Sequence, residues 1–233
     1  MAHRIIDMDT YPRRAHFAHF CAQAYPYVGV TVNVDVTDLV RFCKDRGISY
    51  YLTFIHAAAL AADAVPEFRQ RIHEGGIAEY DECPTSHTEP LPDGTYCYCT
   101  LHHHMPFDEY IRLAARTREQ YRQRGTIEED EDVESMYFIS TVPWLHYTAL
   151  IQPVAGGGDS NPRITWGRYE PDARGRLMQP VTVLAHHALV DGLHLGRFYE
   201  GLAREIARIA GQYKRRQACA QPPFVTWNKT ANT

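Results

Sequence analysis

The stretch "PVTVLAHHALVDGLHLGRF", residues 180–198, holds an apolar strand, a polar turn and the start of a helix. Successive residues of a strand point to opposite faces, so His186 and His187 at its end are aimed apart, one toward a core and the other toward a cleft. Gly192 permits a tight bend. After it, apolar residues recur at helical spacing to about Ala210, which predicts a closing helix.

The rest of the chain adds strands and helices in mixed order. Alternating valines in residues 28–36 predict a half-buried strand, and Thr37 or Asp38 is expected to cap the helix that follows. Further helices are predicted over 39–47, 52–65 and 107–125, and strands over 75–82, 94–101, 136–144, 147–154, 163–170 and 179–187.

Interspersed elements in one compact chain indicate a single domain over residues 1–211, of the α/β class (an α+β two-layer sandwich with a mixed β-sheet flanked by helices). Residues 212–233 mix basic residues with two prolines and are expected to form a loose tail. The acidic stretch 126–135 is expected to be a solvated linker.

Composition excludes several classes of protein. The 233 residues carry a net charge of −4, which gives no reason to expect nucleic acid as a partner. No apolar run approaches the ~20 residues that span a bilayer, and the first residues contain no secretory apolar segment, so we expect a cytoplasmic protein with no membrane partner. The six cysteines show no C-x-x-C spacing and are expected to be free, small buried side chains.

The histidines raise three alternatives. A pair beside a carboxylate can be a general base, a metal site or core packing. His102–His104 poses the same question, since three consecutive residues cannot all reach one ion from a strand, although two can from a loop. A metal-dependent hydrolase built on His186 and His187 lacks a convincing third ligand, so we expect no metal site.

One motif in the opening stretch resembles a known family. "HHALVDG" is similar to the H-H-x-x-x-D-G signature of the chloramphenicol acetyltransferase family and of the related dihydrolipoyl acyltransferase cores. Ala188 stands where the lipoyl-core branch usually has arginine, which favours the former branch. Five motifs occur in family order between about residues 10 and 205: "YPRRAHF" (11–17), "VPEFRQRI" (65–72), "FISTVPW" (138–144), "ITWGRY" (164–169) and "HHALVDGLHLGRF" (186–198).

The resemblance implies catalytic roles. His187 matches the general base that takes the proton of the acceptor hydroxyl, and Asp191 matches a structural carboxylate paired with Arg13. Ser140 matches the hydroxyl that donates to the oxyanion intermediate, and Thr165 matches a residue that holds a bound water near it. Two further histidines of this region, His186 and His194, are expected to be structural rather than catalytic.

The resemblance also implies two binding sides. Trp144 and Tyr169 match aromatic residues on the coenzyme side, and Arg168 stands for a basic residue that attracts the coenzyme phosphate. Ser49 replaces a lysine common near that phosphate, and residues 83–107 depart from the usual acceptor-pocket pattern. The aromatic residues expected on the acceptor wall are Phe20, Tyr25 and Tyr27.

The implied activity is O-acetyl transfer from acetyl-CoA, a co-substrate rather than a permanently bound cofactor, to chloramphenicol or a similar small acceptor. Transfer is expected in a ternary complex, in a homotrimer whose active sites lie at subunit interfaces, with antibiotic resistance as the associated role. An acyltransferase with an unrelated hydroxyl acceptor and a catalytically silent binding protein of the same fold are the alternatives. The presence of His187, Ser140, Arg13 and Asp191 together argues against silence.

Overall fold

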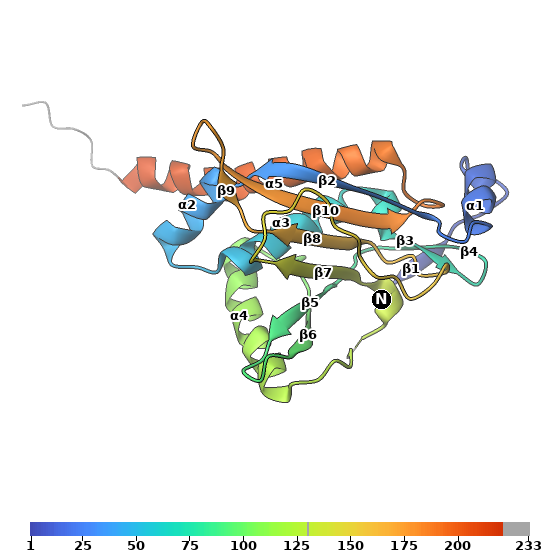
Figure 1. Ribbon diagram of the computed structural model, residues 1–233, viewed down its shortest axis with the longest axis horizontal. Coiled ribbons are helices and arrows are strands. Elements are labelled where there is room, and N and C mark those ends of the chain that lie inside the picture. Colours follow the sequence, from blue (N-terminus) through green and yellow to red (C-terminus); the bar gives the residue numbers. More distant parts are fainter. Residues whose placement is uncertain (130, 221–233) are drawn as a thin grey trace, which may run out of the picture.

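The computed structural model describes residues 1–129 and 131–220 (Figure 1). Helices and strands are interspersed along the chain, as the sequence predicts. In order they are β1 (His3–Ile5), α1 (Arg14–Cys21), β2 (Tyr27–Asp35), α2 (Thr37–Arg46), α3 (Tyr50–Asp63), η1 (Pro66–Arg69), β3 (Gln70–His73), β4 (Gly76–Tyr80), β5 (Thr85–Pro90), β6 (Tyr96–Leu101), α4 (Phe107–Arg124), η2 (Val133–Ser135), β7 (Tyr137–Val142), β8 (Arg163–Gly167), β9 (Glu170–Pro171), β10 (Leu177–His186) and α5 (Gly192–Ala220).

A mixed sheet forms the centre of the fold. Its strands follow the order β2-β10-β8-β7-β5-β6, with β9 paired to β10, while β1, β4 and β3 form a separate small sheet. The pairs β5–β7 and β7–β8 are parallel, and β10 is antiparallel to both β2 and β8. The predicted α/β class with a mixed, helix-flanked sheet is confirmed.

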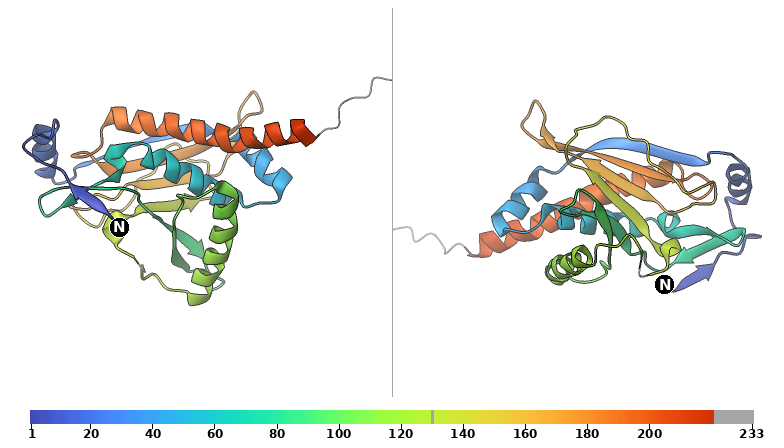
Figure 2. Two further views of the ribbon diagram at one scale, coloured as in Figure 1. Left: turned by 180° about the vertical axis from the view of Figure 1, so that it is seen from behind. Right: turned by 60° about the horizontal axis from the view of Figure 1, so that its bottom comes forward.

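Helices α3 and α5 cover one face of this sheet, as the view from behind in Figure 2 shows. The two helices approach closely because small residues meet, with Gly201 of α5 against Ala61 of α3. Phe198 of α5 also stacks on Phe68, with ring centroids 5.4 Å apart, and both rings are fully buried. Each such ring contributes about 1.5–3 kcal/mol by leaving water. On the opposite face of the sheet, residues 150–155 and 158–161 line a cavity together with Ser140 and Thr165.

The ends of α2 show one correct and one wrong prediction. Gly47 terminates the helix with a φ of 61°, a left-handed conformation that favours glycine. Neither Thr37 nor Asp38 caps the other end, since the N-cap is Val36, which has no capping side chain. The carboxylate of Asp35 accepts the N–H of Thr37 at 3.0 Å instead. An acceptor on the last residue of β2 therefore satisfies the first turn of the helix.

The strand predicted over residues 147–154 is wrong. These residues form no strand and run across the face of the sheet, and the Ile151 side chain is 91% exposed. Because β5 and β8 already flank β7, no sheet edge is left beside it for another strand. Conversely, the unpredicted strand β5 inserts between β7 and β6.

The closing helix is longer than its apolar pattern predicts. Helix α5 continues beyond Ala210 to Ala220, so the first part of the expected tail is helical, and residues 221–233 lie outside the described residues. Four of the cysteines, Cys43, Cys83, Cys97 and Cys99, are free and buried as predicted, whereas Cys21 is free but exposed. Among the described helices, none combines the length and apolar character needed to cross a bilayer.

Candidate active site

His187 directly follows β10, where its backbone N–H donates to the carbonyl of Pro26 at 2.7 Å. Its ring Nδ1 lies 3.0 Å from the carbonyl oxygen of Val190. A carbonyl can only accept, so Nδ1 carries the proton of the neutral imidazole and Nε2 keeps a free lone pair. The turn that follows the strand thus fixes the tautomer that a general base requires.

Phe20 of α1 covers one face of this imidazole. The two rings are stacked, with centroids 3.9 Å apart and planes inclined by 14°. His187 stays partly accessible, so its ring is held flat without being sealed in the core. The residue predicted for the acceptor wall therefore lies directly against the predicted base.

Arg13 and Asp191 form the ion pair that the resemblance implies. A guanidinium nitrogen of Arg13 lies 3.3 Å from a carboxylate oxygen of Asp191, and the same guanidinium donates to the carbonyl of Leu189. The other carboxylate oxygen accepts the N–H of Leu193 at 3.0 Å, at the start of α5. Burial acts to raise the pKa of Asp191, but the charges of His194 and Arg13 and the backbone donors outweigh it, and the pKa is lowered. The pair clamps the turn that aims His187.

His194 also helps to fix the turn that contains Asp191. Its Nδ1 accepts the backbone N–H of Asp191 at 3.1 Å, and its Nε2 lies 3.4 Å from a carboxylate oxygen of Glu67. The ring is buried, and burial lowers its pKa. These contacts fit the structural role expected for His194, and Glu67 is a partner that the sequence did not indicate.

His186 is a structural histidine, as expected. Its Nε2 donates to the carbonyl of Gly157 at 2.9 Å and its Nδ1 accepts the N–H of Ala188 at 3.2 Å. Burial lowers the pKa of this ring, which is 1% exposed. Both nitrogens are used by the backbone, so His186 fixes the loop around Gly157 rather than offering a base.

Ser140 and Thr165 lie side by side on β7 and β8 and line a cavity of about 1060 Å³. The hydroxyl of Thr165 donates to the side-chain carbonyl of Gln152 at 2.8 Å, a partner that the sequence did not indicate. Ser140 is half-buried. Its side-chain hydroxyl forms no hydrogen bond with any of the residues that the structure describes. Its O–H is therefore available to a ligand in the cavity.

Residues 127–129 and 133–134 of the acidic stretch form one wall of this cavity. The carboxylate of Glu129 accepts the hydroxyl of Thr100 at 3.0 Å and the hydroxyl of Ser86. Two hydroxyls on adjacent strands thus hold a residue that was predicted to lie in a solvated linker, and that prediction is wrong for Glu129. The rest of the lining is mostly apolar, although it also includes Glu128, Glu134 and the ion pair of Asp159 with Arg163.

His187 does not line the cavity that contains Ser140. Ser140, Thr165 and Thr182 are neighbours across three strands, which spans about 10 Å. His187 lies five residues beyond Thr182, about 17 Å along the strand. Strand alternation also gives the face of Thr182 to His186, not to His187. One chain therefore does not bring the predicted base and the predicted oxyanion donor to the same reacting atoms.

The two tyrosines predicted for the acceptor wall lie at the start of β2 and just before it. Tyr25 is 57% exposed, and its ring centroid is 5.1 Å from that of Tyr27. The Tyr27 hydroxyl donates to the carbonyls of Asp159 (2.8 Å) and Gly156, and burial together with the charge of Asp159 raises its pKa to about 12. Tyr27 therefore anchors the loop, while Tyr25 is free to meet a ligand.

Trp144 and Arg168, two of the residues predicted for the coenzyme side, are chain neighbours of Leu145 and Gly167, where two backbone segments pass close to each other. A Cβ on Gly167 would lie 2.4 Å from the carbonyl of Leu145, so only glycine lets this loop pass over β8. Trp144, beside the crossing, is 76% exposed and offers a free aromatic face. Arg168 forms an ion pair with Glu170 at 2.6 Å, which partly offsets its charge.

The other coenzyme-side positions are tied into the fold. The Tyr169 ring meets Tyr50 edge-on at 5.6 Å. Ser49 accepts the N–H of Leu52 at 3.3 Å and caps α3, so this replacement of a lysine serves the helix. Trp144 is thus the most accessible of the predicted coenzyme-side residues.

The sequence matches one protein family over most of its length. The profile of the family described as chloramphenicol acetyltransferase matches residues 1–203. A chloramphenicol acetyltransferase of Proteus mirabilis is 26% identical over 195 residues, covering 83% of this chain and 89% of the relative. One from Streptomyces acrimycini is 29% identical over 207 residues, covering 87% and 93%.

Solved structures share the fold. A chloramphenicol acetyltransferase structure superimposes with a TM-score of 0.78 at 24% identity, covering 88% of this chain and all of the other. The cubic core of the pyruvate dehydrogenase multienzyme complex superimposes with a TM-score of 0.61 at 17% identity, covering 84% and 87%. The fold is therefore common to both branches that the sequence motif resembles.

Proposed function

We propose, since the chain belongs to the chloramphenicol acetyltransferase family and is an acetyl-CoA-dependent acetyltransferase, that it acetylates a hydroxyl of chloramphenicol or of a similar small acceptor. His187 is the general base of this reaction. The observation that carries the proposal is the bond from His187 Nδ1 to the carbonyl of Val190, because it leaves Nε2 as the proton acceptor. Acetyl-CoA is a metabolite of the cell interior, so we place the reaction in the cytoplasm.

The reaction proceeds in a ternary complex of enzyme, acetyl-CoA and acceptor. His187 Nε2 takes the proton of the acceptor hydroxyl while the hydroxyl oxygen forms a bond to the thioester carbonyl carbon. The tetrahedral intermediate then breaks its carbon–sulfur bond, and the coenzyme thiolate leaves with the proton returned by the imidazolium. The products are an acetyl ester and free coenzyme A.

Ser140 stabilises the intermediate in this proposal. Its half-buried hydroxyl opens into the cavity beside Thr165, so it can donate to the oxygen on which negative charge develops. Loss of one such donor costs about 10²–10³ in turnover. Thr165 and Gln152, bonded at 2.8 Å, support a bound water at the same place.

The functional unit is a homotrimer with the active site at each subunit interface. The separation of His187 from Ser140 within one chain supports this proposal, because a second copy must bring one of the two groups to the reaction centre. Cyclic symmetry then gives three equivalent sites. Phe20 and Tyr25 belong to the side that carries His187.

The cavity beside Ser140 is lined mostly by apolar residues together with the carboxylate of Glu128, so it favours an acceptor that has an apolar part as well as hydroxyl or amide donors. Chloramphenicol has such donors, and so do other small hydroxylated compounds. A free-thiol assay with acetyl-CoA and a panel of acceptors tests the proposal. Thiol release with chloramphenicol supports it, release only with other acceptors selects the alternative acyltransferase, and no release across the panel refutes acetyl transfer to this class of acceptor.

A further inference from the structure

A second histidine cluster lies on the helix-covered side of the sheet. His103 and His104, in the loop between β6 and α4, both direct Nε2 at one carboxylate oxygen of Asp63, the last residue of α3. The distances are 2.6 Å from His103 and 2.5 Å from His104. A fourth group, the carboxylate of Glu82, lies 3.7 Å from His104 Nε2.

Among the described residues, no lysine or arginine forms an ion pair with Asp63. The Asp63 side chain is only 7% exposed, and within the described ranges its ion-pair partners are the two histidines. Its other oxygen accepts the hydroxyl of Tyr137 at 2.8 Å, which orients the carboxylate toward the imidazoles. A buried carboxylate needs a compensating cation, and metal-binding carboxylates are commonly oriented by such an outer hydrogen bond.

We propose that Asp63, His103 and His104, with Glu82 as the fourth ligand, form a binding site for a divalent transition metal, for which Zn²⁺ is the test ion. The ligand atoms of the first three residues lie within 4.8 Å of one another. Two imidazole nitrogens and two carboxylate oxygens are a ligand set that suits Zn²⁺, at about 2.0–2.2 Å from each atom. Since tetrahedral ligands at that bond length are about 3.3 Å apart, the present contacts need to open by less than about 1 Å. His104 is 44% exposed and has room to move.

The run of histidines does not indicate this site by itself, because the third ligand, Asp63, lies far away in the sequence. Asp63 lies 40 residues before His103 in sequence and reaches it only through the packing of α3 against the sheet. His102, the first residue of the run, takes no part, because its Nε2 lies 2.8 Å from the carboxylate of Glu131. Two of the three consecutive histidines converge, as a loop allows.

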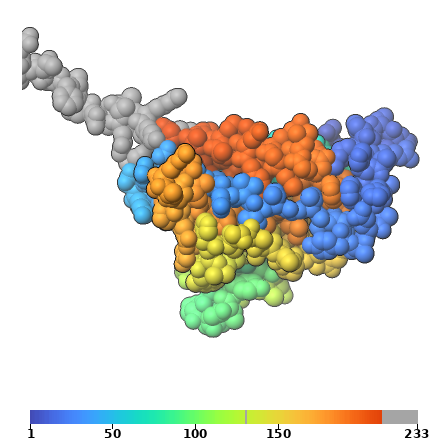
Figure 3. Space-filling model, turned by 45° about the horizontal axis from the view of Figure 1, so that its top comes forward, coloured from blue at the N-terminus to red at the C-terminus, as the bar shows by residue number. Residues whose placement is uncertain are grey.

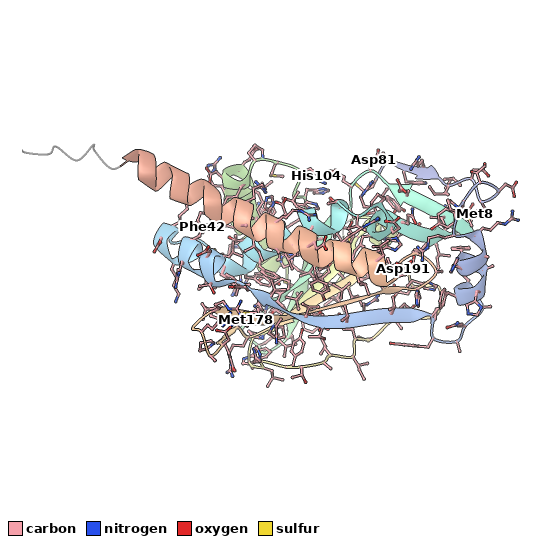
Figure 4. All side chains as sticks on the ribbon, turned by 90° about the horizontal axis from the view of Figure 1, so that it is seen from above. Met8, Phe42, Asp81, His104, Met178 and Asp191 are labelled. Carbon is pink, nitrogen blue, oxygen red and sulfur yellow. The ribbon has the colours of Figure 1, made fainter. Side chains whose placement is uncertain are left out.

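The ion would tie the end of α3 to the loops before β5 and before α4. Figure 4 shows His104 and Asp81 on one side of α5, with β2 and Met178 on the other side, and Asp191 at the start of the helix. Tyr137 and Ser140 occupy opposite faces of β7, so the cluster is separated from the active-site cavity by the sheet. The role of the ion is therefore structural, independent of the proposed function.

Metal binding is tested on the full chain after chelation and gel filtration. Wild-type protein incubated with Zn²⁺ is expected to retain one more zinc per chain than His104→Ala by elemental analysis. Its Tm should rise by about 5 °C or more at a hundredfold excess of free Zn²⁺ over Kd. The matched control His102→Ala should behave as wild type, and Mg²⁺ should shift neither protein.

A second variant guards against effects of truncation. Asp63→Asn keeps the shape of the side chain and its bond to Tyr137 but removes the charge, and it should lose the Zn²⁺-dependent Tm shift. The proposal is overturned if wild type retains no zinc, or if wild type, His104→Ala and His102→Ala respond alike. Acetyl transfer is measured separately, and its presence or absence does not bear on this result.

Discussion

The carbonyl oxygen of Val190 accepts the Nδ1 proton of His187 at 3.0 Å, three residues along the same turn. Phe20 stacks on one face of the ring, and the ion pair of Arg13 with Asp191 fixes the turn that follows the histidine. Figure 3 shows the N-terminal segment that carries α1 at the opposite end of the molecule from the C-terminal end of α5. The base is thus positioned by groups from both ends of the sequence.

His187→Ala removes the general base. We expect turnover to fall by about 10²–10⁴ or more, with little change in stability, because the side chain is only partly buried and makes one hydrogen bond. Steady-state acetylation kinetics measure the loss, and circular dichroism with gel filtration checks the fold and assembly. A folded variant with near-normal turnover would remove His187 from the role of base.

Ser140→Ala removes the oxyanion donor. Turnover should fall by about 10²–10³ while the KM for acetyl-CoA changes little, since the bond forms only as charge develops in the transition state. Thr141→Ala is the matched control, because the Thr141 hydroxyl donates to the carbonyl of Trp166 on the neighbouring strand. Equal losses in both variants would indicate a structural effect on β7.

Asp191→Asn tests the clamp through pH. The folded pKa of Asp191 is lowered, so the carboxylate adds stability at neutral pH that is lost as pH falls through that pKa. The pair is partly exposed and is worth about 0.2–1 kcal/mol, or roughly 1–4 °C in Tm. Thermal melts should therefore show a deficit at pH 7 that narrows below pH 3.8 and closes once the pH is below the folded pKa of Asp191. A deficit that does not change with pH would contradict this assignment.

His186 makes the fold sensitive to acid. Its folded pKa lies below the ordinary value of 6.5, so the unfolded chain binds more protons and stability falls as pH drops below about 6.5. The contribution is at most about 1.4 kcal/mol per pH unit. In His186→Gln, whose amide can still donate to Gly157, urea unfolding between pH 7 and pH 5 should show a smaller slope with pH. An unchanged slope would show that His186 does not control this dependence.

Local patterns predicted the central elements of the fold. Alternating valines identified β2, and apolar residues at helical spacing identified α5. The strand predicted over residues 147–154 failed because β5 and β8 occupy both positions beside β7, which no local pattern can show. Sequence periodicity reports burial along one element, not competition between elements for a sheet edge.

The site residues that lie within the family motifs could be predicted from the sequence. The pairing of Arg13 with Asp191 followed from the resemblance, and their 3.3 Å contact confirms it. Glu67, Gln152 and Glu129 were missed, because each reaches the site through tertiary contacts. No spacing rule connects residues so far apart in sequence.

In the proposed trimer, His187 of one chain acts with Ser140 of a neighbouring chain, and mixing two inactive variants distinguishes this shared site from a site within one chain. Co-assembly of His187→Ala with Ser140→Ala should restore about a quarter of the wild-type activity, since in a cyclic trimer a site is intact when each neighbour supplies its unmodified residue. Mixing His187→Ala with the double variant is the control and should restore none. If mixed oligomers, isolated by two different tags, are no more active than their parents, the proposal of a shared site is contradicted.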